Sequence, residues 1–428
     1  MDTPSPRVSK FQVTPYIKGE LSRPKNVSKV LTIVLFILFI VMEVANFSAF
    51  YTGIAKPTQV GAIWALLACF ALYAENAVNA RSKIHPFQLV GALLFLIGIP
   101  GLVLSNPGLQ QTLFYVVYIF AMALRLVLVF IILPRIMMRS EKSPIHLILN
   151  WMLFASFIAC LVVIYDYTTL GFNIFNSARP GPGTGAKWIN PNLAGFYATF
   201  AFYTAFLAER AKPILRLSSI SVGFYLAMVS QSRNALFVIA FSTIIYVALL
   251  ILENPKKYSM RIVGWGTTGL VLLFTIFVVF KDLPMIQGLS RRFSSEDFTT
   301  GRDDYAVVAL EIWRSSPLFG QGFTGIQIDN AYITFMLETG IVGLIIYLAV
   351  FGAILYNGWR HFLQGNQTEK ILGKAIIVMG IAIFIRGFAE NVSFMMITDL
   401  QSNAFCILAA ISFLIPIRRT NTILPSST

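Results

Sequence analysis

The chain has 428 residues, of which 57% are hydrophobic and only 12% are charged. Soluble domains carry about 25% charged residues, so this composition excludes a water-soluble globular enzyme and indicates a polytopic membrane protein. The net charge is +14, but the Lys and Arg residues occur in small groups between apolar segments, which excludes a dense nucleic-acid-binding surface.

The polar, basic residues 1–28 are predicted to form a disordered cytoplasmic tail, and residues 29–428 a single all-α membrane domain. A helix needs about 20 apolar residues to cross a bilayer, and the apolar runs of this domain predict about twelve such helices. Their expected ranges are 30–51, 58–78, 87–104, 109–133, 145–170, 191–209, 213–230, 234–252, 261–280, 329–357, 371–390 and 394–417.

The distribution of basic residues predicts the orientation of these helices. With the amino terminus placed in the cytoplasm, 22 Lys and Arg residues fall in cytoplasmic segments and 10 in outward-facing segments, while Arg125 lies within a span. Cytoplasmic loops of membrane proteins carry an excess of Lys and Arg. We therefore expect both termini to lie in the cytoplasm.

Two outward-facing segments are longer than the others. Residues 171–190 are rich in Gly, Pro and Asn, which favours irregular backbone. Residues 281–328 combine arginines with acidic residues. Within them, Thr300 and Asp303 have the spacing of an N-cap and a first-turn acid, so we predict a short amphipathic helix that begins there.

The outward-facing arginines are the first candidates for ligand binding. Guanidinium groups match phosphate oxygens in a bidentate manner, so a lipid-linked diphosphate is the ligand they favour. The alternative is that they pair with neighbouring acidic residues and only solvate a loop. The arginines are Arg179, Arg233, Arg291, Arg292, Arg302 and Arg386.

The three histidines, His85, His146 and His361, all fall on the cytoplasmic side of this topology. An outward-facing site then has no imidazole, and a base there must be a carboxylate. Asp329 and Glu338 are the candidates. They are nine residues apart, and a rotation of about 100° per residue places them on opposite sides of one helix. A hydrogen bond to a neighbouring helix is the structural alternative for Glu338.

Acidic residues also occur as adjacent pairs in the long outer segment. Asp303 is followed by Asp304, and Glu296 by Asp297. Carboxylates bind divalent cations, but a pair of adjacent acids supplies too few ligands by itself. We therefore predict neither a metal nor another cofactor.

Four segments, in this order, resemble the signature of the O-antigen ligase and polymerase superfamily: WINPNLAG (188–195), SQSRNAL (230–236), TTGRDDYAVVALEIWRSSPLFGQGF (299–323) and DNAYITFMLETGIVGL (329–344). The resemblance covers roughly residues 188–345. It implies a bacterial inner-membrane glycosyltransferase of the C superfamily, with about twelve spans and a large periplasmic loop. Its substrates are glycans linked to undecaprenyl diphosphate.

The resemblance also implies roles for individual residues. Arg233 and Arg302 match the arginines of the SR and GR motifs, which contact the diphosphate. The ligases carry a His-Asn pair before the tenth span, whereas this chain has Asp329 and Asn330. That difference favours a Wzy-type polymerase of polysaccharide repeat units over an O-antigen ligase.

In the mechanism that we expect, Arg302 stabilises the departing diphosphate at the periplasmic face, and Asp329 orients or deprotonates the acceptor hydroxyl. Arg179 and Lys187 help to hold glycan or diphosphate. Membrane lipid and a chain-length regulator are further candidate partners. The competing hypotheses are an O-antigen ligase that transfers glycan to lipid A core, a flippase or other transporter, and a cell-wall glycan polymerase.

Overall fold

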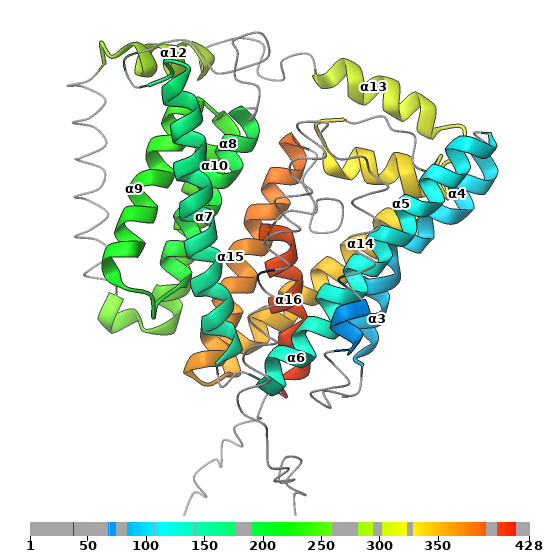
Figure 1. The fold of residues 1–428 in the computed structure, drawn as a ribbon, viewed down its shortest axis with the longest axis horizontal. Coiled ribbons are helices and arrows are strands. Elements are labelled where there is room, and N and C mark those ends of the chain that lie inside the picture. Colours follow the sequence, from blue (N-terminus) through cyan, green and yellow to red (C-terminus); the bar gives the residue numbers. More distant parts are fainter. Residues whose placement is uncertain are drawn as a thin grey trace, which may run out of the picture.

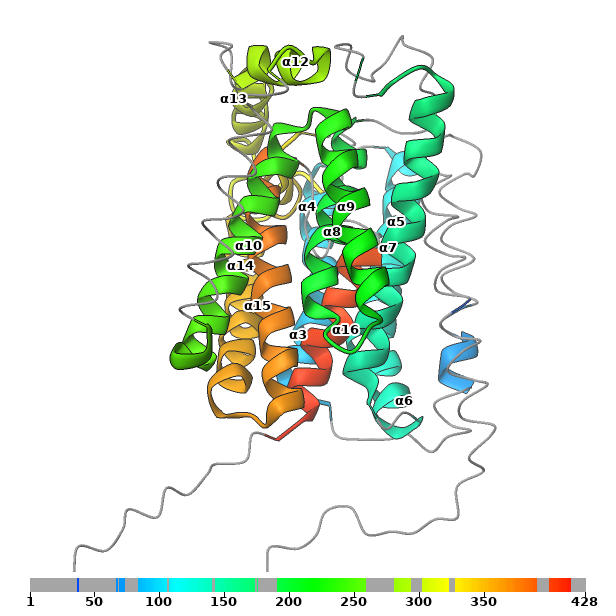
Figure 2. The same ribbon diagram turned by 90° about the vertical axis from the view of Figure 1, so that its left-hand side faces the viewer.

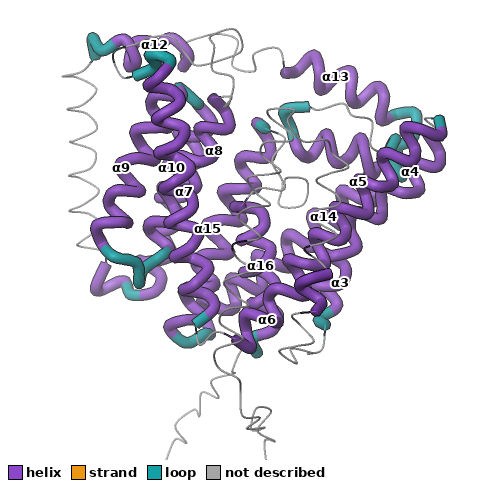
Figure 3. Tube along the Cα trace, viewed as in Figure 1, coloured by secondary structure: helices purple, strands orange, loops and turns teal. Residues whose placement is uncertain are grey.

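The structure is a computed structural model. It describes residues 37, 67, 69–73, 84–105, 108–140, 143–173, 175, 191–258, 281–293, 302–322, 328–390 and 400–416. Within these ranges every regular element is a helix and no residue forms a strand (Figure 3). Seven of the helices are long and apolar enough to cross a membrane. The described chain is therefore all-α and of the multi-pass membrane type, as the composition predicts.

The helices follow the expected apolar runs closely. Their bounds are α3 (Pro86–Leu93), the 3-10 helix η1 (Leu94–Ile97), α4 (Gly98–Ser105), α5 (Leu109–Val127), the π-helix η2 (Leu128–Ile132), α6 (Leu133–Ser140), α7 (Pro144–Thr169), α8 (Pro191–Leu207), α9 (Pro213–Ser230), α10 (Arg233–Glu253), α12 (Pro284–Phe293), α13 (Arg302–Trp313), α14 (Ala331–Gln364), α15 (Gln367–Ala389) and α16 (Leu400–Leu414). Proline begins several of them, because its fixed φ suits the first helical position.

Several predictions concern residues that the structure does not describe. The expected spans 30–51, 58–78 and 261–280 lie wholly or mostly outside the described residues, as does most of 171–190. The long segment 281–328 contains α13 where a short helix was expected, and also α12, which the sequence analysis missed. Proline at the start of α12 was the available signal.

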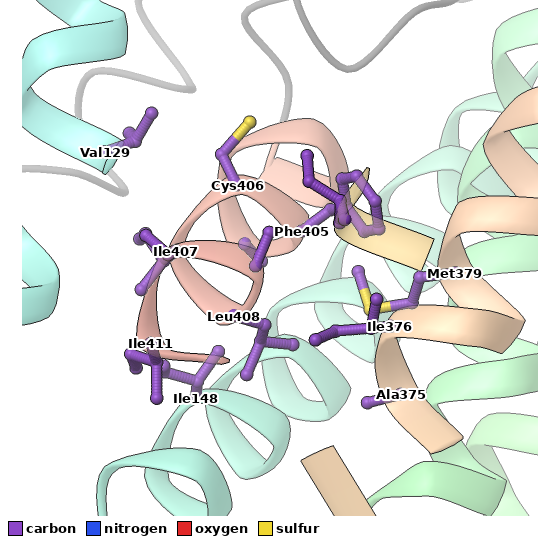
Figure 4. Close-up of a cluster of buried hydrophobic side chains, with 14 of the residues drawn as sticks. Val129, Ile148, Ala375, Ile376, Met379, Phe405, Cys406, Ile407, Leu408 and Ile411 are labelled. Carbon is purple, nitrogen blue, oxygen red and sulfur yellow. The ribbon is translucent and has the colours of Figure 1, made fainter. Parts of the chain in front are cut away.

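The helices form one bundle with a central pair (Figures 1 and 2). α7, α8, α9 and α10 pack against one another on one side, and α3, α4, α5 and α14 lie on the other. α15 and α16 stand between them. Figure 4 shows Phe405, Leu408 and Ile411 of α16 directed toward Ile148 of α7 and Ile376 of α15. α12 and α13 lie across one end of the bundle (Figure 1).

A buried lysine joins three helices at the opposite end of the bundle. Lys374 of α15 is 2% exposed, and its Nζ lies 2.6 Å from a carboxylate oxygen of Glu209 and 3.2 Å from one of Glu253. Glu209 follows α8 and Glu253 ends α10. These two ion pairs therefore hold the end of α8, the end of α10 and the first part of α15 close together.

α14 is interrupted, although the sequence predicts one continuous helix over 329–357. Gly340 has φ 70° and ψ −174°, which breaks the helical path. Segment 317–322, which follows α13, enters the break and forms backbone hydrogen bonds with the residues on both sides of it. The amides of Gln321, Gly322, Ile341 and Val342 donate to the carbonyls of Leu337, Glu338, Pro317 and Leu318, with N···O distances of 2.8, 3.0, 3.0 and 3.3 Å.

Glycine is required where the two backbones meet. Gly340 and Gly320 both have positive φ, which disfavours any residue with a Cβ. A Cβ on Gly320 would lie 2.5 Å from the carbonyl carbon of Glu338, and a Cβ on Gly340 would overlap the carbonyl group of Leu318. The break of α14 and the course of segment 317–322 therefore depend on each other.

We expect the substitution Gly340→Ala to lower the free energy of unfolding by about 3 kcal/mol, because it combines an unfavourable φ with a backbone overlap. The matched control is Gly352→Ala in the same helix, where an added Cβ has no neighbour within 4 Å. This control should be neutral or slightly stabilising, since alanine favours helix over glycine. Thermal unfolding of the purified variants in detergent measures both effects. Equal midpoints for the two variants would contradict the requirement.

Candidate functional site

Three helices begin at the end of the bundle over which α12 and α13 lie, and we call this end the motif end. α8 begins at Pro191. α10 begins after Ser232, whose Oγ accepts a hydrogen bond from the amide of Ala235. α14 begins after Asn330, whose Oδ1 accepts hydrogen bonds from the amides of the second and third helical residues, both at 3.0 Å. Three amino-terminal helix ends, two of them capped by a side chain, thus lie at the motif end.

The first two motif segments, 188–195 and 230–236, are in direct contact. A Cβ on Gly195 of α8 would lie 2.8 Å from side-chain atoms of both Ser232 and Ala235. Only glycine lets the start of α8 approach the start of α10 this closely. The contact fixes the position of Arg233, the partly exposed first residue of α10.

Arg386 connects the carboxyl end of α15 to the start of α8. Its side chain is 1% exposed, and Nε and Nη2 donate to a carboxylate oxygen of Glu390 at 2.8 and 2.5 Å. Nη2 also donates to the carbonyl of Asn192 at 2.7 Å, and Nη1 donates to the hydroxyl of Thr199 at 3.2 Å. The guanidinium lies 4.5 Å from the ring centroid of Phe196. Arg386 therefore lies at the motif end with its donors directed at protein acceptors.

The start of α14 is fastened to the end of α15. The side-chain amide of Asn330 donates to the carbonyl of Phe388 at 3.1 Å. The hydroxyl of Tyr332 donates to the carbonyl of Phe384 at 2.7 Å, and its ring centroid lies 4.7 Å from that of Phe388. The side-chain oxygen of Asn330 thus caps α14, and its side-chain nitrogen attaches the start of α14 to the end of α15. Asp329, the residue before it, is exposed.

α13 completes the arrangement. Its Ala309 is buried together with Ile328 and with Leu337 of α14. Segment 317–322 then continues from α13 into the break of α14. All four motif segments are thereby linked through one continuous set of contacts, which runs from α10 to α8, α15, α14 and α13.

The structure places the other predicted site residues as follows. Arg302 and Asp303 begin α13, and Arg291 and Arg292 lie near the end of α12, so all four are in helices that cross the motif end (Figure 1). Arg291 is exposed. Arg179 and Lys187 lie outside the described residues.

Glu338 lies deeper in the bundle than Asp329. Asp329 precedes the N-cap of α14, and Glu338 lies seven residues beyond Ala331, the first residue of the helix, which corresponds to about 10 Å along the axis. The side chain of Glu338 is 6% exposed, and its Oε2 has no hydrogen-bond partner in the described part of the chain. The hydrogen bond to a neighbouring helix, considered above as the alternative, is therefore not formed by Oε2. Asp329 is exposed and Glu338 is buried, so the two carboxylates do not line one common surface.

The histidines lie away from the motif end. His361 approaches the carbonyl of Ser412 at 2.7 Å, and the ring of His85 stacks on Phe413 at 4.9 Å, both at the carboxyl end of α16. His146 lies in the first turn of α7, whose last turn is at the motif end. Among the described residues, no three His, Cys, Asp or Glu side chains are grouped so that they could hold a metal ion.

Sequence reasoning missed the partners of Arg386. Glu390 follows it by four residues, which is the spacing of a helical ion pair and was a usable signal. The carbonyl of Asn192 and the hydroxyl of Thr199 had no such signal, because they come from a helix nearly 200 residues earlier in the chain.

We expect Arg386→Leu to destabilise the protein by about 3–5 kcal/mol, because it leaves the carboxylate of Glu390 buried without its counter-charge. The double variant Arg386→Leu with Glu390→Leu removes both charges and should recover a measurable part of that loss. Thermal unfolding of wild type, both single variants and the double variant gives the coupling energy. Additive effects of the two substitutions would contradict the ion pair.

Comparison with known proteins adds no assignment to this geometry. No family model matches the chain, and no curated protein matches its sequence. Any functional interpretation therefore depends on the four motif segments and on the way the motif end brings them together.

Proposed function

We propose that this protein is a bacterial polysaccharide repeat-unit polymerase of the Wzy type, acting on O-antigen or exopolysaccharide. It would transfer a glycan from undecaprenyl diphosphate to the non-reducing end of a second lipid-linked repeat unit. One observation carries the proposal: the four segments that resemble the O-antigen ligase and polymerase superfamily are linked by contacts at one end of the bundle. Segments that share a site must converge in this way.

In this proposal the chain crosses the inner membrane twelve times, and the motif end faces the periplasm. The support comes from charge. The excess of Lys and Arg falls in the segments assigned to the other end, which is the end of the bundle that also holds Lys374 and its two glutamates. Both termini then lie in the cytoplasm.

The donor diphosphate would bind where α8, α10 and α14 begin. Amino-terminal helix ends carry a partial positive charge, so they favour anions. Arg233 stands at the start of α10 and Arg302 at the start of α13. Arg179, Lys187, Arg291 and Arg292 are proposed as outer contacts to diphosphate or glycan. Arg386 is proposed to position α8 rather than to bind the diphosphate, because its donors are already directed at groups of α8.

The reaction is a displacement at the anomeric carbon of the growing chain. The acceptor hydroxyl oxygen forms the new glycosidic bond, and the bond from the anomeric carbon to the diphosphate oxygen breaks with its electron pair. Asp329 would orient the hydroxyl and take its proton. Arg302 would stabilise the departing diphosphate electrostatically. Asn330 holds Asp329 in place through its cap of α14.

We expect Arg302→Lys to reduce the polymerisation rate by about 100-fold, because the charge remains but the bidentate fork is lost, and Arg302→Ala to reduce it further. Arg314→Lys, on an exposed arginine just beyond the end of α13, is the matched control and should leave the rate unchanged. The assay uses purified protein in liposomes with one lipid-linked repeat unit. Wild-type protein should produce a ladder of longer lipid-linked products.

Each competing hypothesis gives a different outcome in these liposomes. An O-antigen ligase would form product only when lipid A core is supplied. A flippase would move the lipid-linked unit between leaflets without new glycosidic bonds, and a cell-wall glycan polymerase would use a cell-wall precursor instead. Any of these results, or a full ladder from Arg302→Ala, would contradict the proposal.

A further inference from the structure

The central helix of the bundle presents an exposed aromatic ring at the motif end. α15 is the most buried of the seven described helices that are long and apolar enough to cross a membrane, yet Phe388 in its last turn is 56% exposed. α15 stands between the two halves of the bundle (Figures 1 and 2). The ring of Phe388 is therefore exposed at the end of the bundle and not on the perimeter that contacts lipid.

Two other aromatic residues hold this ring in place. The ring centroid of Phe388 lies 4.7 Å from that of Tyr332 and 5.2 Å from that of Phe384, and the second contact is edge-to-face. Tyr332 is fixed in turn, because its hydroxyl donates to the carbonyl of Phe384 at 2.7 Å and its ring packs on Gly387, where an added Cβ would lie 3.0 Å from the hydroxyl oxygen. Aromatic pairs in such geometries attract each other. The protein thus orients the ring of Phe388 from behind and leaves more than half of the side chain exposed.

The exposed ring lies near the proposed base. The carbonyl of Phe388 accepts a hydrogen bond of 3.1 Å from the side chain of Asn330, and the exposed Asp329 is the residue before Asn330. Arg386 precedes Phe388 by two residues, so a rotation of about 100° per residue places it on almost the opposite side of α15, where it contacts α8. Phe388 therefore lies on the side of α15 that faces the start of α14 and Asp329.

The chemistry of the ring selects its ligand. A phenylalanine side chain has no donor for a phosphate oxygen, so Phe388 does not suit the diphosphate. A pyranose ring presents a face of C–H groups, whose partial positive charge matches the negative face of an aromatic ring, while its hydroxyls remain at the rim. The exposed carboxylate of Asp329 near the ring favours such hydroxyls and disfavours a purely apolar ligand such as a polyprenyl chain.

We propose that Phe388 is the platform on which a pyranose of the acceptor repeat unit stacks, with the reacting hydroxyl directed toward Asp329. This inference rests on the proposed function and names a residue that binds the acceptor glycan. Tyr332 and Phe384 position the platform through their contacts with its ring.

The test supplies an acceptor that cannot act as a donor. It is the free repeat-unit oligosaccharide, cut from the polysaccharide of the encoding organism and reduced at its anomeric end, so that it carries no leaving group. With a fixed amount of lipid-linked donor in liposomes, we expect Phe388→Leu to raise the half-saturating acceptor concentration by about 10-fold and to change the maximal rate little.

Two variants serve as controls for this measurement. Phe388→Tyr keeps the aromatic ring and should remain near the wild-type value. Tyr165→Leu, on an exposed aromatic residue near the carboxyl end of α7, removes a ring that the proposal does not use and should also behave as wild type. An unchanged half-saturating concentration in Phe388→Leu, or an equal increase in Tyr165→Leu, would overturn the platform.

A binding measurement without a reaction separates this inference from the proposed function. Saturation-transfer NMR of the same oligosaccharide with purified protein in detergent reports which sugar protons contact the protein. We expect transfer to the C–H protons of one pyranose face with wild type and Phe388→Tyr, and loss of that transfer with Phe388→Leu. Absence of transfer with wild type, or equal transfer with wild type and Phe388→Leu, would overturn the platform even if the protein polymerises. Transfer that depends on Phe388 in a protein that forms no polymer would support the platform and contradict the polymerase.

Discussion

Peptide groups in the apolar part of a membrane must find their hydrogen-bond partners within the protein, because hydrocarbon offers none. In this chain that constraint acts most strongly at the break of α14, where Gly340 leaves the helical path. Segment 317–322 supplies the missing partners through four backbone hydrogen bonds. The same bonds attach α13 to α14, so the position of the helix that begins with Arg302 follows from a backbone requirement.

Buried charged side chains elsewhere in the bundle must likewise find their partners within the protein. α15 carries two basic residues that are almost inaccessible to solvent, Lys374 near one end and Arg386 near the other. Lys374 is balanced by Glu209 and Glu253, and Arg386 by Glu390 and by two groups of α8. Both ends of α15 are thereby held against α8 or the residues that follow it. The shape of the motif end depends on charge compensation as much as on apolar packing.

The sequence predicts the helices well, because hydropathy and proline placement mark where apolar runs begin and end. α7, α9 and α10 lie within one residue of their expected bounds at each end. The break of α14 escapes this reasoning, since the apolar run in 329–357 continues past Gly340 and hydropathy does not register a positive φ. Gly340 and Gly320 were visible in the sequence, but their meeting is a tertiary contact between segments about 20 residues apart.

The candidate site also has a part that the sequence predicts and a part that it does not. Ordered motifs identify Arg233, Arg302 and Asp329 as candidates, and the structure places their helices at one end of the bundle. Burial distinguishes residues that sequence treats alike: Arg386 and Arg233 are both outward-facing arginines, yet only Arg386 is fully buried. No local pattern predicts that difference, because the groups that bury Arg386 come largely from α8.

The central claim is that the motif end binds the lipid diphosphate, and a cryo-electron microscopy structure of the protein with undecaprenyl diphosphate tests it most directly. The account predicts density for the diphosphate beside the first turns of α8, α10 and α14, within reach of Arg233 and of the start of α13. Density for the diphosphate at the opposite end, beside Lys374 and its glutamates, would contradict it.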